Sequence, residues 1–256
     1  MLSVFIRVLF SFMPGELPVA HLQGRERGAY VQAMFGRIAR RYDRMNRLMT
    51  FGRDRAWRRY VVQQAALAPG GRLLDLGSGT GDIALEALRR IDRVSAVGAD
   101  FTLEMMRVGR ARQGGADVLW CGADALRLPF PDAAFDAVAS GYLARNVTDV
   151  SAVFKEQRRL VRPGGRIVCL DTSPPARGLL QPFILFYLRV VIPLSGRLIA
   201  GDSSAYKYLP ESTRQFKTPD ELAAIMREAG LADVRYRRFM FGTMAVHVGT
   251  RPVAEN

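Results

Sequence analysis

A glycine-rich stretch bordered by two carboxylates has the clearest chemistry in the sequence. It reads LLDLGSGTGD over residues 73–82, with glycines at positions 77, 79 and 81. Glycine lets the backbone turn tightly and approach a ligand without side-chain clashes. A helix beginning after the loop offers unpaired N–H groups to ligand oxygens. These features alone suit a dinucleotide as well as other nucleoside ligands, so the loop by itself does not identify its ligand.

Two aspartates distinguish between the ligands that such a loop can hold. Asp75 lies two residues before Gly77, and Asp82 stands where a dinucleotide fingerprint requires Gly or Ala. Carboxylates beside the turn repel a pyrophosphate. They suit a ligand with an ammonium and a sulfonium group, which S-adenosylmethionine (SAM) has and NAD lacks. The loop therefore predicts SAM as the cofactor.

Two more carboxylates are expected at the same edge of a sheet. Asp100 ends the next predicted strand, where it can accept hydrogen bonds from both ribose hydroxyls. Asp124 follows the third predicted strand, where it can accept from the adenine amine. The carboxyl ends of successive parallel strands line the ligand crevice in open α/β sheets. Aspartates in register at these ends favour a binding site over solvated strand ends.

The elements that must position these residues follow an alternating pattern. Hydrophobic runs predict strands at 72–76, 94–99, 118–121, 135–140 and 166–170, and amphipathic spacing predicts helices at 82–90, 102–112 and 150–161. Strands that alternate with helices imply parallel βαβ units. A capped helix over 218–229 and an antiparallel pair of strands at 234–239 and 243–250 follow. We expect an α/β fold with a doubly wound, mostly parallel sheet of seven strands.

The N-terminal part is predicted to form a basic helical cap, with helices over 29–48 and 53–66. Residues 25–59 hold eleven arginines against Glu26, Asp43 and Asp54, in a chain of net charge +13. Either the composition simply favours arginine, or the cap faces an anionic partner such as a membrane surface. The apolar residues 1–14 carry Arg7 and are too short to span a bilayer. They read as an interfacial anchor or an over-extended start.

A second apolar segment, residues 179–200, interrupts the alternation. Two prolines and the arginines Arg189 and Arg197 disfavour a transmembrane span. A helical lid over an apolar pocket, or a membrane-contacting helix, fits better. We divide the chain into an N-terminal segment and cap (1–66) and a SAM-binding domain (67–256), with a helical insertion near 179–212 inside a lid segment at 176–216.

Cysteine and histidine indicate neither a disulfide framework nor a metal site. Cys121 and Cys169 lie in strand-like runs without a CxxC pair, and His21 and His247 are the only histidines. We expect buried thiols in a reducing compartment. His247, in the last strand, is expected to have a core role.

Several blocks are similar to those of one enzyme family. Residues 41–59, RYDRMNRLMTFGRDRAWRR, resemble a Tyr-Asp-x-Met-Asn-x-x-Met-Ser-Phe-Gly segment, and LPFPDAAFDAV, ARNVTD and VRPGGR look like further blocks. AYKYLPESTRQF at 205–216 is distinctive, because generic methyltransferases lack it. On these residues the chain, from about 29 to 250, resembles the ubiquinone/menaquinone biosynthesis C-methyltransferase family of Rossmann-like class I methyltransferases.

The resemblance implies methylation of a ring carbon on a demethylated quinol with a polyprenyl tail, either a benzoquinol or a naphthoquinol. Together with the loop, it gives the expected cofactor-binding set: Asp75, Gly77, Ser78, Gly79, Thr80, Gly81, Asp82, Asp100, Phe101, Asp124, Ala125, Ser140 and Gly141. Two segments depart from the family pattern. Tyr142-Leu143 stands where the family has Phe-Gly, and residues 171–175 replace a Glu-Phe-Ser-Lys-Pro block. Both departures bear on the acceptor.

The reaction requires a base, or a charge that favours a phenolate, beside the acceptor ring. Methyl transfer is an in-line displacement, so the enzyme mostly supplies orientation, and deprotonation of the ortho hydroxyl makes the ring carbon nucleophilic. The expected catalytic residues are Arg145, Asn146, Tyr42 and Asn46. The alternatives are an ion pair between Arg145 and Asp149, and a core role for Tyr42.

Partners and location follow from the same features. The expected acceptor is a polyprenyl quinol, and the basic cap and apolar insertion suit a cytoplasmic protein held peripherally at the inner face of an anionic membrane. A homodimer is left open. Without a base-flipping motif or a recognition domain, we expect no nucleic-acid partner. Two alternatives remain: a methyltransferase of another lipid, such as a phospholipid headgroup amine, and a non-catalytic SAM-binding scaffold of a quinone-synthesis complex.

Overall fold

The computed structural model describes residues 24–175, 178–179, 181–191, 208 and 211–253. Its centre is a seven-stranded sheet with the order β3-β2-β1-β4-β5-β7-β6. The strands are β1 (Arg72–Leu76), β2 (Ser95–Asp100), β3 (Leu119–Gly122), β4 (Phe135–Gly141), β5 (Val161–Thr172), β6 (Ala232–Phe239) and β7 (Met244–Thr250). The first five strands run parallel, and β7 is antiparallel to both β5 and β6. The expected fold class is confirmed.

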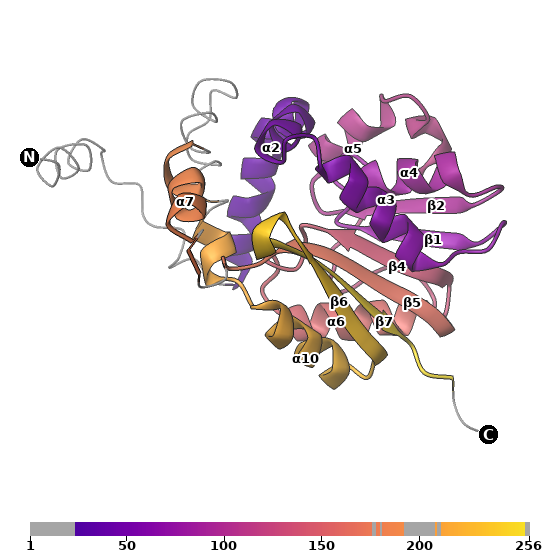
Figure 1. Ribbon diagram of the computed structural model, residues 1–256. Helices are drawn as coiled ribbons and strands as arrows, with labels where there is room; N and C mark the ends of the chain where they lie inside the picture. Colours follow the sequence, from indigo (N-terminus) through magenta and orange to yellow (C-terminus); the bar gives the residue numbers. More distant parts are fainter. Residues whose placement is uncertain (1–23, 176–177, 180, 192–207, 209–210, 254–256) are drawn as a thin grey trace, which may run out of the picture.

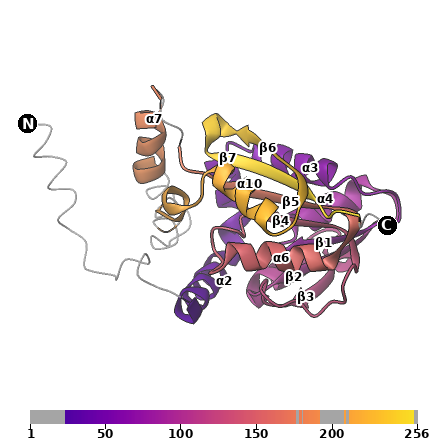
Figure 2. The ribbon, with the colours of Figure 1, turned by 90° about the horizontal axis from the view of Figure 1, so that it is seen from below.

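Helices cover both faces of the sheet (Figures 1 and 2). On one face α3 (Asp54–Ala65) and α4 (Asp82–Arg90) pack against residues such as Leu73, and on the other α6 (Val150–Leu160) and α10 (Pro219–Glu228) pack against residues such as Leu74. Neighbouring strand residues point to opposite faces, so one apolar run fills both cores. α5 (Leu103–Arg110) packs on β2 and β3.

The N-terminal cap consists of a long helix followed by a short one. α2 (Gly24–Met49) lies along α5, and its apolar stripe of Met34, Ile38 and Met45 packs against Tyr208. α3 follows after a short turn. This confirms both helices expected from the apolar spacing. Because α2 lies over the carboxyl ends of the strands, its side chains reach the ligand crevice.

Two local expectations differ from the structure. β5 begins at Val161 rather than 166, with a register shift between the partners of Phe135 and Ala137. The Pro-Gly-Gly sequence stays inside the strand, because a Cβ atom at Gly165 would lie 2.5 Å from the Asp136 carbonyl oxygen and glycine has none. Thr102 occupies the N-cap position of α5, but its side chain makes no cap hydrogen bond.

The insertion after β5 is described only in part. It contains α7 (Gln181–Phe186) and a π-helical turn, Tyr187–Val191. Among the described segments, no helix has both the length and the apolar character needed to cross a membrane. The expected interfacial segment at 1–14, His21, and the apolar segment from 192 to 200 lie outside the described residues.

Candidate cofactor and active site

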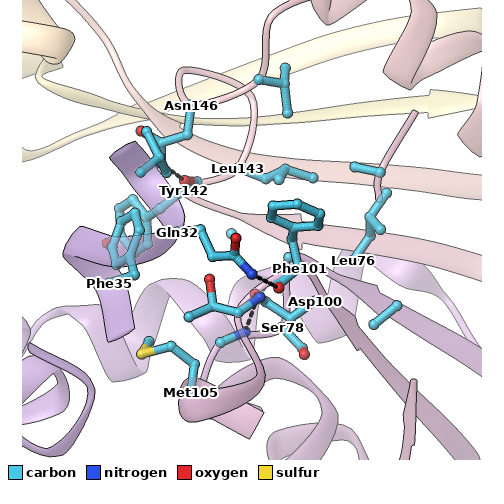
Figure 3. A pocket seen from close by; sticks show the side chains of 18 of the residues that line it. Gln32, Phe35, Leu76, Ser78, Asp100, Phe101, Met105, Tyr142, Leu143 and Asn146 are labelled. Carbon is cyan, nitrogen blue, oxygen red and sulfur yellow. Dashed lines mark hydrogen bonds between the residues drawn. The ribbon is translucent and has the colours of Figure 1, made fainter. Parts of the chain in front are cut away.

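A cavity of about 720 Å³ opens at the carboxyl ends of β1, β2 and β4, beneath α2. Figure 3 shows Tyr142, Leu143 and Asn146 on one side of it and Ser78 and Met105 on the other. Eleven of the thirteen expected cofactor-binding residues line it: Asp75, Gly77, Ser78, Gly79, Thr80, Asp82, Asp100, Phe101, Asp124, Ala125 and Gly141. The other two, Gly81 and Ser140, do not line it.

The loop needs its glycines for two physical reasons. Gly77 and Gly81 have φ angles of +66° and +80°, in the left-handed region that side chains rarely adopt. A Cβ atom at Gly81 would also lie 2.6 Å from the Trp120 ring, and one at Gly77 would lie 2.9 Å from Leu143. Gly81 therefore shapes the loop from behind and does not face the cavity.

Asp100 is held with its carboxylate beside the cavity. Its Oδ2 accepts a hydrogen bond from the Gly79 N–H at 2.7 Å, and its Oδ1 accepts from the Thr102 N–H at 2.7 Å. Each oxygen keeps a further lone pair. Burial raises the pKa of Asp100, although the two N–H donors oppose that shift. This arrangement suits a ligand with vicinal hydroxyls, as the ribose of SAM has.

Asp75 is the most deeply buried carboxyl group of the cavity wall. It is 1% exposed and accepts a hydrogen bond from the Ala84 N–H in the first turn of α4, at 3.0 Å. Burial raises the pKa of Asp75 to about 7. A cationic ligand in the cavity would favour its charged form. The position therefore fits the ammonium or sulfonium group that the sequence led us to expect.

Asp82 has a different electrostatic role from the one expected. Its carboxylate pairs with Arg58 at 2.9 Å and with Arg112 at 2.6 Å. Burial would raise the pKa of Asp82, but the two guanidinium groups outweigh it and hold the pKa below its usual value. Two cations thus compensate its charge. The negative charge available to a cationic ligand therefore comes from Asp100 and, once the ligand favours its charged form, from Asp75.

A polar network ties the loop to α2. The Thr80 hydroxyl donates to Asp43 Oδ1 at 2.8 Å, and Arg112 donates to the Thr80 carbonyl oxygen at 2.9 Å. Arg112 also lies 3.3 Å from the Asp43 carboxylate. Sequence reasoning missed Arg112 and Asp43, which lie 69 positions apart by their numbers and carry no motif of their own. The network fixes Thr80 at the cavity wall.

The far end of the cavity is less enclosed. Asp124 is exposed there, and its Oδ1 accepts a hydrogen bond from the Leu126 N–H at 3.0 Å. The Phe101 carbonyl accepts from Gln32 of α2 at 2.9 Å (Figure 3). Ser78 is buried, and its Oγ has no hydrogen-bond partner within the described chain. Apolar walls, carboxylates and a free hydroxyl together fit SAM.

Two expected catalytic residues, Tyr42 and Asn146, also line the cavity. Burial raises the pKa of the Tyr42 phenol, against the opposing charge of Arg145, so the hydroxyl stays protonated at neutral pH. Asn146 uses both ends of its amide. Its Nδ2 donates to the Tyr142 carbonyl at 2.8 Å, and its Oδ1 accepts from the Tyr208 hydroxyl at 2.9 Å. Tyr208 belongs to the distinctive block at 205–216.

The other two, Arg145 and Asn46, lie behind the cavity wall. Arg145 is 5% exposed and pairs with Asp171 at 2.7 Å, and its N–H also donates to that carboxylate. The alternative partner, Asp149, instead accepts the Ala152 N–H as the cap of α6. Asn46 is buried, and its Nδ2 has no partner in the described residues.

Tyr142 was not expected as a site residue. It follows β4 in a left-handed conformation with φ of +61°, which is rare for a bulky side chain. The Arg145 guanidinium carbon lies 5.2 Å from its ring centroid, and the charge of Arg58 acts on its phenol, whose pKa burial raises. The departure from the family pattern at Tyr142-Leu143 is the sequence feature from which a role for Tyr142 in the site could have been predicted.

His247 and the two cysteines lie outside the site, and Cys121 is less buried than expected. His247 is 1% exposed, with Nε2 2.9 Å from the Pro219 carbonyl oxygen, in a core position. Cys169 is buried and Cys121 half-buried, and both are free thiols. No cluster of metal-ligating side chains occurs among the residues that the structure covers.

Comparison with known proteins shows which family this chain is similar to. Residues 23–251 match the model of the ubiE/COQ5 methyltransferase family. The chain is 47% identical to "Ubiquinone/menaquinone biosynthesis C-methyltransferase UbiE" of Desulfotalea psychrophila, covering 88% of this chain and 92% of that protein. It is 46% identical to "Demethylmenaquinone methyltransferase" of Roseiflexus castenholzii, covering 88% and 95%.

Solved structures share the fold at low identity. A putative methyltransferase in complex with the Haloferax volcanii Trm112 activator has a TM-score of 0.60 at 19% identity, covering 86% of this chain and 98% of that one. A putative SAM-dependent methyltransferase of Methanococcus maripaludis also has a TM-score of 0.60, at 15% identity, covering 85% and 93%. At these identities the likeness concerns the fold alone.

Proposed function

The chain belongs to the ubiE/COQ5 methyltransferase family, and from that premise we propose that it methylates a ring carbon of a demethylated polyprenyl quinol in respiratory quinone biosynthesis. It is a SAM-dependent methyltransferase. One observation supports an acceptor site beside the cofactor. The loop that suits SAM borders the same cavity as the wall formed by Tyr42, Tyr142 and Asn146. Donor and acceptor can therefore meet in one enclosed space, which is what an in-line transfer requires.

When bound, SAM supplies an electrophilic methyl group on its sulfonium. The chain's own residues provide orientation and charge. Asp100 suits the ribose hydroxyls, and Asp75 contributes negative charge beside the cationic end. Around 70% or more of a small ligand is commonly enclosed in such pockets, which excludes water from the transfer.

On the acceptor side, we propose that Tyr42 donates a hydrogen bond to a ring oxygen, because its pKa is raised and it faces the cavity. Asn146 lines the same wall and holds the Tyr142 carbonyl. Arg145 and Asn46 act from behind this wall: the field of Arg145 favours charge on a ring oxygen, and Asn46 supports Tyr42. Asp171 sets the orientation of Arg145 through their ion pair.

The acceptor class follows from the names of the relatives, which include demethylmenaquinone methyltransferases and ubiquinone/menaquinone biosynthesis enzymes. We propose peripheral attachment to the inner face of an anionic membrane, since the acceptor carries a polyprenyl tail and the cap is rich in arginine.

The test is mass spectrometry of quinones from cells that lack the protein. We expect a quinone one methyl group lighter than the usual product to accumulate, and the wild-type gene to restore the usual mass. A gene encoding the Asp100→Asn variant serves as the matched control and restores it poorly. An unchanged quinone pool would overturn the proposal. SAM binding by the purified protein without turnover on demethylated quinols would favour the scaffold alternative.

A further inference from the structure

Exposed apolar side chains gather where α7 meets the turn between α2 and α3. Phe51 is 72% exposed, and Phe183 and Phe186, three residues apart on α7, are 74% and 61% exposed. Figures 1 and 2 show α7 standing away from the sheet. We call these side chains the aromatic knob; it comprises Leu48, Phe51, Leu179, Phe183, Phe186 and Val190. A large exposed apolar patch on a soluble protein marks an interaction site.

The fold holds the two halves of the knob together, although they lie about 130 positions apart. The Tyr187 hydroxyl donates a hydrogen bond to the Met49 carbonyl at 2.9 Å. The Tyr187 ring stacks on Phe51, with centroids 5.8 Å apart. Phe51 itself has a φ of +53°, a conformation that a bulky residue avoids unless the surroundings impose it. Specific contacts therefore hold α7 and the α2–α3 turn together, so the knob is a single surface.

Positive charge surrounds the knob on the α2–α3 side. Arg44, Arg47, Arg53 and Arg55 are exposed, and none of them is within ion-pair distance of a carboxylate in the described part of the chain. Asp54 is the one acidic residue between positions 44 and 55, and it is buried and paired with Arg58. The surface thus combines projecting aromatic side chains with a collar of exposed arginines that form no close ion pair in the described chain.

We propose that the aromatic knob inserts into the interface of an anionic lipid bilayer while the four arginines contact lipid phosphates. Aromatic side chains favour the boundary between acyl chains and headgroups, and basic residues beside them bind anionic lipid. A second copy of the chain fits this surface less well than a bilayer does. In a two-fold dimer the same patch faces itself, so the two arginine collars would repel each other.

This inference rests on the proposed function, because a polyprenyl acceptor resides in the bilayer that the knob would enter. It adds the surface and the orientation: α7 and the α2–α3 turn face the lipid, whereas the edge of the sheet at β3 faces away. Contact through this surface would bring the cap, and the cavity beneath α2, to the membrane.

The first test is vesicle binding by the full chain. The variant Phe51→Ser/Phe183→Ser/Phe186→Ser is compared with wild type and with Leu119→Ser, whose side chain is also 61% exposed but lies on β3 at the opposite edge of the sheet. On vesicles of phosphatidylglycerol and phosphatidylcholine, we expect the triple variant to bind at least about tenfold more weakly. Leu119→Ser should bind as wild type does, and vesicles of phosphatidylcholine alone should bind wild type more weakly.

The second test separates this inference from the proposed function. With a short-chain, water-soluble demethylated quinol the triple variant should match wild type, whereas with a polyprenyl quinol in vesicles it should lose most of its activity. Unchanged Tm and SAM affinity establish that it is folded. Vesicle binding equal to wild type, or a wild-type dimer that the triple variant dissociates, would overturn the inference. Failure of wild type to methylate either quinol would overturn the proposed function and leave the vesicle result to stand alone.

Discussion

Tyr208 donates a hydrogen bond from its hydroxyl to Oδ1 of Asn146, a residue 62 positions earlier in the chain. Through the other end of the same amide, Asn146 holds the carbonyl of Tyr142, whose backbone is left-handed. A residue of the insertion therefore reaches the cavity wall formed by Tyr142 and Asn146 through two consecutive hydrogen bonds.

Tyr208→Phe should lower kcat/KM for the acceptor by up to about tenfold, because it leaves the half-buried Asn146 Oδ1 without its protein donor, and a lost hydrogen bond of this kind costs about 0.5–1.5 kcal/mol. The dissociation constant of SAM should stay unchanged, since no cofactor residue is touched. Steady-state kinetics and calorimetry measure the two quantities. Tyr208→Ala, which also removes packing against Met34 and Met45, should in addition lower the Tm. Wild-type kinetics in Tyr208→Phe would show that the bond is dispensable.

Arg145→Ala should abolish turnover while SAM still binds. The change also leaves Asp171 buried without its partner, which costs about 3–5 kcal/mol of folding free energy. For that reason the double variant Arg145→Ala/Asp171→Ala is the necessary comparison: it should recover much of the lost Tm but none of the turnover. The role of Arg145 is excluded if either variant turns over like wild type.

Asp100→Asn should weaken SAM binding by about ten- to a hundredfold. The carboxylate accepts two backbone N–H bonds and has lone pairs left for the ribose, and an amide cannot accept from all of these donors. Titration calorimetry measures the affinity. Asp124→Asn is the matched control, because Asp124 is exposed, and we expect a smaller loss there. Equal losses of SAM affinity in the two variants would contradict the larger role assigned to Asp100.

Stability should depend on pH through Asp75. Its pKa is about 7 in the folded chain, above the ordinary value of 3.8, so the folded state binds more protons than the unfolded state between those two values. The contribution of Asp75 to the free energy of unfolding therefore falls as pH rises from about 4 to about 7. The free energy of unfolding of Asp75→Asn, taken relative to that of wild type, should therefore rise by up to about 4 kcal/mol between pH 4 and pH 8. Urea unfolding at both values measures this difference, and parallel pH curves for the two proteins would refute it.

Local pattern was enough to predict the scaffold. Strand β1 and helix α4 begin and end at the predicted residues, because apolar spacing and the glycines of the loop mark their bounds directly. The carboxylates of the cofactor site followed from the same reasoning: Asp75 and Asp100 lie at strand ends, and parallel strands bring those ends to one edge.

Contacts between distant segments were beyond that reasoning. The partner of Arg145 is Asp171, at the end of a neighbouring strand, and the nearer Asp149 is used as a helix cap. Asp82 is paired with Arg58 of α3 and with Arg112, in the turn that follows α5. Hydrophobic periodicity encodes which side of an element is buried, whereas an ion pair depends on which elements meet. The choice among many arginines therefore required the structure.

The position of β7 constrains the order of folding. β6 precedes β7 in the chain, yet it pairs with β7 and with no other strand of the described sheet, and β7 in turn pairs with β5. During synthesis β6 emerges before its partner strand, with only α10 to pack against, and the edge of β5 stays unpaired until the residues of β7 follow. β6 can therefore join the sheet only together with β7 or after it. Until β7 pairs with it, that edge is an unpaired strand edge, which is the kind of surface that promotes aggregation of a nascent chain.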